Sequence, residues 1–169
     1  MPETVAAAEG VTVETRYEPW IVTGIEPDEI VREARRNGPK GRFSWTGWHL
    51  APRFPYRRAR GACTTGPVRT KLTVTHALPV WKPRKPPRDA IEAAWADNLR
   101  DVIAHAGVRR DNAVEAANAL QQALSDLGPE RDCKLLRARA RNELKRISDS
   151  HRRRDDELSA DNWDEAFGR

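Results

Sequence analysis

The sequence predicts an α+β fold in which a small antiparallel sheet packs against two long antiparallel helices, with a short helix near the N-terminus. Three observations lead to this fold class. Residues 89–127 contain no proline and repeat apolar side chains every three or four positions, which is the period of one buried helix face. Residues 129–160 repeat that pattern after a Gly128-Pro129 break. Residues 68–78 alternate apolar and polar side chains, as a strand with one solvated face does.

The N-terminal part predicts strands separated by one helix. Residues 11–23 alternate loosely, which indicates one or two edge strands. Pro27 begins a helix with acidic residues in its first turn and arginines in its last turn, a distribution that complements the helix dipole. Asn37-Gly38-Pro39 ends this helix, and residues 41–52 predict the next strand.

The middle part predicts a basic loop followed by the strongest strand. Residues 52–61 indicate a turn-rich loop whose Arg57, Arg58 and Arg60 could contact phosphate, although a solvated loop is the simpler interpretation. We expect the strand at residues 68–78 to bury alternate side chains, namely Val68, Thr70, Leu72, Val74 and His76. Residues 78–81 close the strand, and the proline-rich residues 82–87 predict an extended linker.

The apolar stripe of the first long helix is interrupted in its middle by Arg109 and Arg110. His105, Arg109 and Asn112 follow one another at four and three residues, which places them on one face of the helix. Arginine on the inner side of a helix requires a carboxylate, an anion or water. We therefore predict that these three residues line a pocket against the sheet, with Trp45 or Trp48 as its apolar wall.

Length and charge suggest one domain with a basic surface. A chain of 169 residues is long enough for a single core, so residues 1–169 predict one domain, in which residues 152–169 either pack back or form a loose tail. Lysine and arginine number 30 against 25 acidic residues, a net charge of +5. Because both signs are interleaved, nucleic acid is a weaker expectation than a small anion. The sequence contains no transmembrane run and no secretion signal, so we expect a cytoplasmic location without membrane contact.

Several motifs lie along most of the chain. They are Tyr17 with the VTG after it, NGP at residues 37–39, FSWTGW at residues 43–48, Cys63, LTVTHALPVW at residues 72–81, and the central helix through to Cys133. Together these segments resemble a bacterial uncharacterised-domain family of predicted secreted zinc-dependent proteases. The resemblance implies a zincin-like fold, in which an HExxH helix supplies two zinc ligands and a general base.

This chain departs from the HExxH pattern that the resemblance implies. His105 corresponds to the first histidine, but Ala106 stands at the glutamate position and Arg109 at the second histidine position. The tail contains no histidine that could replace the further ligand of the family. His49, His76 and His151 have no spacing that directs them towards His105. We therefore expect no metal and no cofactor.

The resemblance also concerns the two cysteines, Cys63 and Cys133. In an exported relative they would form a disulfide, whereas in a cytoplasmic chain they would be two buried thiols. Neither lies in a CxxC or His/Cys cluster, so they do not predict a metal site.

Three functional hypotheses follow. The favoured one is a metallopeptidase-like domain without its zinc site, whose cleft binds a peptide or a small anionic ligand or performs metal-free acid–base chemistry. His105 and Arg109 would be the catalytic residues, and Asn112, Trp45 and Trp48 would contact the ligand. The alternatives are an active hydrolase with an unconventional metal site, and a basic module that binds nucleic acid or an acidic protein.

Overall fold

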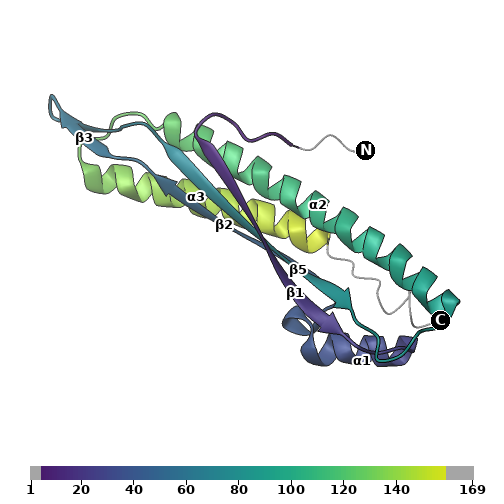
Figure 1. The fold of residues 1–169 in the computed structure, drawn as a ribbon. Helices are drawn as coiled ribbons and strands as arrows, with labels where there is room; N and C mark the ends of the chain where they lie inside the picture. The colour runs from purple at the N-terminus through teal and green to yellow at the C-terminus, as the bar shows by residue number, and fades with distance from the viewer. Residues whose placement is uncertain (1–4, 159–169) are drawn as a thin grey trace. The chain divides into compact units, whose positions relative to one another are not determined.

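The computed structural model describes residues 5–158 and confirms the α+β class (Figure 1). Its elements are β1 (Val11–Val22), α1 (Pro27–Asn37), the 3-10 helix η1 (Pro39–Gly41), β2 (Trp45–Arg53), β3 (Tyr56–Ala59), β4 (Ala62–Thr65), β5 (Arg69–Trp81), α2 (Asp89–Ser125) and α3 (Cys133–Glu157). None of the helices in residues 5–158 is both long and apolar enough to cross a membrane.

The sheet has three strands in the order β1-β5-β2, so β5 is central. Hydrogen bonds at its margins show how β1 and β5 are aligned. The backbone N–H of Thr70 donates to the oxygen of Gly10, and that of Lys82 donates to the oxygen of Val22. The start of β5 therefore meets the start of β1, and their ends also correspond, which is parallel pairing. The sheet is small as predicted, but the expectation that it is antiparallel is wrong for the pair of β1 and β5.

The predicted basic loop at residues 52–61 is wrong in part, because these residues begin a second, two-stranded sheet. β3 pairs antiparallel with β4, and Ala59 lies opposite Ala62. The two residues between them have positive φ, 50° for Arg60 and 78° for Gly61. Left-handed conformations at both central positions are what a tight hairpin turn requires, and glycine adopts them without strain. The arginine in the turn replaces the usual asparagine or aspartate, so the pattern did not indicate a hairpin.

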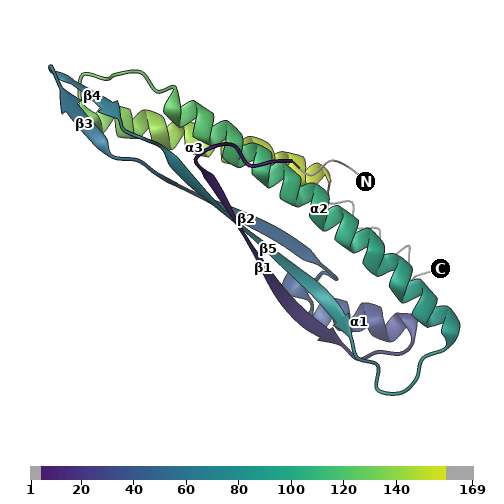
Figure 2. The ribbon, with the colours of Figure 1, turned by 45° about the horizontal axis from the view of Figure 1, so that its top comes forward.

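Both predicted long helices are confirmed. α3 begins at Cys133, four residues later than Pro129, because Asp132 caps it. The backbone N–H of Leu135 donates to Asp132 Oδ1 at 2.8 Å, and this hydrogen bond lowers the pKa of the carboxyl group. Figures 1 and 2 both show α3 beside the C-terminal half of α2. α3 includes residues 152–157 of the predicted tail, and residues 159–169 lie outside the described residues.

The chain divides into two compact units, which are described separately. The first unit comprises Met1–Glu14, Trp48–Val74 and Arg110–Glu157, and the second comprises Thr15–Gly47, Thr75–Arg109 and Leu158–Arg169. That the whole chain acts as one domain stays a prediction.

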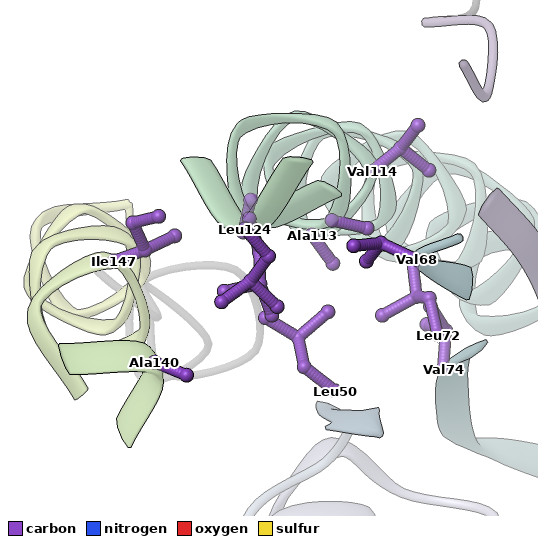
Figure 3. Packing of buried hydrophobic residues seen from close by; sticks show 12 residues of the cluster. Leu50, Val68, Leu72, Val74, Ala113, Val114, Leu124, Ala140 and Ile147 are labelled. Atoms are coloured by element: carbon purple, nitrogen blue, oxygen red, sulfur yellow. The ribbon is translucent and has the colours of Figure 1, made fainter. Parts of the chain in front are cut away.

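The core of the first unit lies among α2, α3, β2 and β5. Figure 3 shows its side chains directed towards one another from these elements, among them Leu50, Leu72, Val74, Ala113, Leu124, Ala140 and Ile147. A disulfide between Cys63 and Cys133 joins β4 to the first residue of α3. Of the two alternatives for the cysteines, the structure thus has the covalent bond.

The core of the second unit is rich in aromatic residues. The rings of Trp81 and Trp95 stack with centroids 5.0 Å apart, and Phe43 meets Trp95 edge-on at 5.2 Å. The Trp81 Nε1–H donates to the backbone oxygen of Gly24 at 2.7 Å, so the indole buries its apolar body while its polar atom is satisfied.

Candidate functional site

A small recess in the second unit contains two of the predicted site residues. It is lined by Ser44, Thr46, His105, Ala106, Arg109 and Leu158. Its volume is about 20 Å³. A polar cavity of roughly 10–15 Å³ is sufficient for one water molecule. The recess therefore has room for about one water, and a larger ligand would contact these residues from the exposed side.

Helix α2 brings His105 and Arg109 to this recess together. The two residues are one helical turn apart, so their side chains project from the same face. Ala106, the residue after His105, is only 9% exposed, and its methyl group leaves the recess open. His105 is exposed, whereas Arg109 is half-buried and has a further interaction within the protein. The helical spacing in the sequence was enough to predict this pair.

The hydroxyl groups of Ser44 and Thr46 were not predicted as site residues. Thr46 Oγ1 lies 3.0 Å from Nδ1 of His76, which is 4% exposed on β5. The ring of Tyr17 lies against His76, with centroids 5.5 Å apart. A hydroxyl can donate one hydrogen bond and accept others, so Thr46 can bridge His76 and a ligand in the recess. The only sequence signal was the alternation of FSWTGW, which puts both hydroxyls on one side of a strand.

Asn112 belongs to a separate polar cluster in the first unit. It is 2% exposed, and its Nδ2 donates to the backbone oxygen of His151 at 2.9 Å and to Asp155 Oδ1 at 2.6 Å. Asn112 is not among the described residues that line the recess. Three residues of helix rotate a side chain by about 300°, so Asn112 is about 60° away from the direction of Arg109. That rotation directs the amide to α3.

The two tryptophans predicted as a pocket wall are likewise outside the recess lining, as far as the chain is described. Trp48 Nε1–H donates to Asp155 Oδ2 at 2.5 Å in the first unit, and the Arg152 guanidinium lies 5.5 Å from the Trp48 ring centroid. Trp45 lies in the second unit under the Lys40 ammonium, at 4.3 Å. Its ring also covers Gly47, where a Cβ would stand 2.2 Å from Trp45 Cζ2.

The electrostatics of the Asn112 cluster depend on His151. Because Asn112 Nδ2 already donates twice, its Oδ1 is the acceptor for His151 Nδ1–H at 2.8 Å. Burial lowers the pKa of His151 because the charged imidazolium loses water contact, and the Arg154 guanidinium adds to that shift. The carboxylates of Glu115 and Asp155 oppose it. The imidazole is therefore held more strongly in its neutral form than an exposed histidine.

A protein-family model described as "Bacterial protein of unknown function (DUF922)" matches residues 17–164. The chain belongs to this family. The match includes every residue of the recess and of the Asn112 cluster. No curated protein and no solved structure matches this member of the DUF922 family.

The described residues of this DUF922 member do not fit a catalytic zinc ion. Such an ion needs about three protein ligands and an open position. Within residues 5–158, no group of three or more His, Cys, Asp or Glu side chains could hold a metal. In the recess, Ala106 cannot accept a proton, and the permanently charged Arg109 repels a cation. His49 is exposed, and His76 and His151 have the hydrogen-bond partners described above.

Proposed function

We propose that this DUF922 member is a metallopeptidase-like protein that no longer uses zinc, and that it binds a small anion at the recess of His105 and Arg109. The observation that carries the proposal is that an imidazole and a guanidinium, one helical turn apart, line the same recess as two hydroxyl groups. These groups offer hydrogen-bond donors together with a permanent positive charge, which is the chemistry that recognises carboxylates and phosphates.

Arg109 has the capacity for this role even though it already interacts within the protein. A guanidinium has five N–H donors in one plane, so it can hydrogen-bond to more than one acceptor at a time. Being half-buried, Arg109 is screened by water less than a surface arginine. Its charge would therefore attract an anion more strongly than that of the exposed Arg100 on the same helix.

His105 would be the group that exchanges a proton with the ligand. Its side chain is exposed at the recess, so a bound anion can reach an imidazole nitrogen. Thr46 would hold the second side of the anion, and its hydrogen bond to the buried His76 keeps the hydroxyl in place. The proposed chemistry thus uses positioning and proton exchange, with no step through a metal.

The test is a titration of the full-length protein with acetate and, separately, with phosphate, followed by the NMR signals of the His105 ring. We expect saturable shifts that Arg109→Met weakens by roughly tenfold or more, since charge-assisted hydrogen bonds are the strong ones. Arg100→Met is the matched control, because Arg100 is exposed on the same helix and outside the recess. Equal weakening by both variants, or no saturation with either anion, would overturn the proposal.

Metal analysis of the same protein tests the zinc statement separately. We expect no stoichiometric zinc in the purified protein. About one zinc per chain that is released by His105→Ala would favour the unconventional hydrolase instead.

A further inference from the structure

A larger groove in the first unit is unrelated to the recess. It lies between the β2–β3 segment and α3, and it is lined by Pro52, Phe54, Tyr56, Arg137, Ala140, Arg141 and Leu144. Its volume of about 310 Å³ is at the lower end of the range for small-molecule sites, which begins near 300 Å³. The proposed anion site does not use any of these residues.

The charge of the groove is entirely positive. Arg137 and Arg141 are one turn apart on α3, and the lining contains no acidic residue. Within residues 5–158 neither guanidinium forms an ion pair, whereas other basic residues of the same helix do. Those with carboxylate partners include Arg139, Lys145 and Arg146. The two arginines beside the groove are thus available to an external anion.

Tyr56 holds one of these guanidinium groups in a defined position. The Arg137 carbon Cζ lies 4.9 Å from the centroid of the Tyr56 ring. A cation–π contact does not use the N–H groups as donors to an oxygen, so they can still donate to an anion. Phe54 supports Tyr56 edge-on, with centroids 5.2 Å apart. This contact favours a position of the Arg137 guanidinium beside the groove, and such preorganisation reduces the entropy lost on binding.

The other residues that line the groove indicate which chemical groups the anion needs besides its charge. Ala140 is buried and Leu144 half-buried, and together with Pro52 and Phe54 they form an apolar surface beside the charges. A bare inorganic ion would leave that surface in water. A nucleic-acid base is a poor fit, because Arg137 already covers the ring face of Tyr56 on which a base would stack.

We propose that this groove binds a small organic carboxylate with an apolar body. The carboxylate would accept hydrogen bonds from Arg137 and Arg141, and the apolar body would lie on Phe54, Ala140 and Leu144. Two guanidinium groups match the two oxygens of a carboxylate, and the apolar contacts supply affinity through the area removed from water.

The experiment is an NMR titration of the full-length protein, followed by backbone amide shifts, with 4-phenylbutyrate as the probe. Butyrate removes the apolar ring, and 4-phenylbutyramide removes the charge. We expect saturable shifts at Tyr56 and Ala140 with 4-phenylbutyrate, and binding weaker by roughly tenfold or more with each of the other two compounds.

Variants assign the binding to the groove. Arg137→Met and Arg141→Met keep most of the side-chain length. Each should weaken the binding of 4-phenylbutyrate by roughly tenfold. Arg153→Met is the control, because Arg153 is an exposed residue of α3 outside the groove. Arg109→Met should have no effect, which separates this site from the recess. Equal affinity for the acid and the amide, or binding that both groove variants leave unchanged, would overturn the inference.

Discussion

Asn112 illustrates how one buried amide can determine the arrangement of several polar groups. Its three hydrogen bonds join α2 to His151 and Asp155, and Asp155 in turn accepts the indole N–H of Trp48. An uncompensated polar group in such a place is unfavourable, so each member of the cluster depends on the others. The residue that the helical spacing assigned to a ligand therefore has a structural partner instead.

Asn112→Ala should destabilise the protein by about 2–3 kcal/mol, because it leaves the His151 oxygen and one Asp155 oxygen without their donor. Urea unfolding at neutral pH measures the difference. Asn142→Ala, at an exposed position of α3, is the control and should change the free energy of unfolding by less than about 0.5 kcal/mol. Similar effects of both substitutions would contradict the cluster's importance.

The pKa of His151 gives a pH dependence with a definite sign. Because burial lowers this pKa in the folded protein, the unfolded chain binds the proton more readily as the pH falls. The stability contribution is complete above about pH 6.5, the ordinary histidine value, and is lost as the pH falls towards the lowered folded pKa. His151→Gln should reduce the loss of unfolding free energy between about pH 7 and 5. If the unfolding free energy of His151→Gln depends on pH in that window as strongly as that of the unchanged protein, the pKa of His151 does not differ between the folded and unfolded states.

At the scale of elements, the sequence predicted best what depends on neighbours along the chain. Helix α1 has its dipole-matched charges and its Pro27 start, and β5 has its alternating buried residues, so both were predicted correctly. The β3–β4 hairpin was not predicted, because its turn uses Arg60 in a conformation that is uncommon for arginine. The parallel pairing of β1 with β5 depends on residues far apart in sequence, which periodicity does not report.

In the candidate site too, residues close together in sequence were predicted, and residues from distant segments were not. The sequence placed His105 and Arg109 together because they are neighbours on one helix, and both line the recess. Ser44 and Thr46 reach the recess from another element, and only tertiary packing brings them there. Trp45 and Trp48 were assigned to a ligand although each ring already has a cation beside it in the protein. Residue type alone does not distinguish these two uses of a tryptophan.

Replacing glycine with alanine should change the stability in opposite directions at a helix position and at a turn position. Gly107 is inside α2, and a Cβ there would meet nothing within 4 Å, so Gly107→Ala should stabilise the helix by about 0.5–1 kcal/mol. Gly61 also has open space, but its φ of 78° is unfavourable for alanine, so Gly61→Ala should destabilise by about 1 kcal/mol. The unfolding temperature of each variant, compared with that of the unchanged protein, measures the direction of the change. A stabilising Gly61→Ala would contradict the hairpin turn.

For the whole molecule, the disulfide is the strongest single constraint. Cys63 and Cys133 are separated by 70 residues, and a loop of that size predicts a stabilisation of about 4 kcal/mol from the reduced entropy of the unfolded chain. Reductant should lower the unfolding free energy by this amount and so shift the urea midpoint to a lower concentration. The double variant Cys63→Ala with Cys133→Ala should have the reduced protein's stability and no further response to reductant. Identical unfolding curves with and without reductant would contradict this expectation.

The cytoplasmic location stays a prediction, and the cysteines provide its test. Disulfides persist in oxidising compartments and are rare where thiols are kept reduced. If the protein works in the cytoplasm, alkylation in freshly lysed producer cells should label both cysteines, with mass spectrometry as the measurement. Complete protection from the reagent would indicate export and contradict the prediction.

The pairing of β1 with the distant β5 also affects the order in which the chain can assemble. During synthesis β1 leaves the ribosome long before β5 exists, whereas β3 and β4 can pair at once across their two-residue turn. β1 must therefore wait as an unpaired strand, and it remains at the edge of the sheet afterwards. Its exposed middle contains Arg16, Glu18 and Pro19, which are the residue types that discourage a foreign strand from adding to an open edge. We therefore expect the charged and proline residues of β1 to discourage such addition both before and after β5 pairs with it.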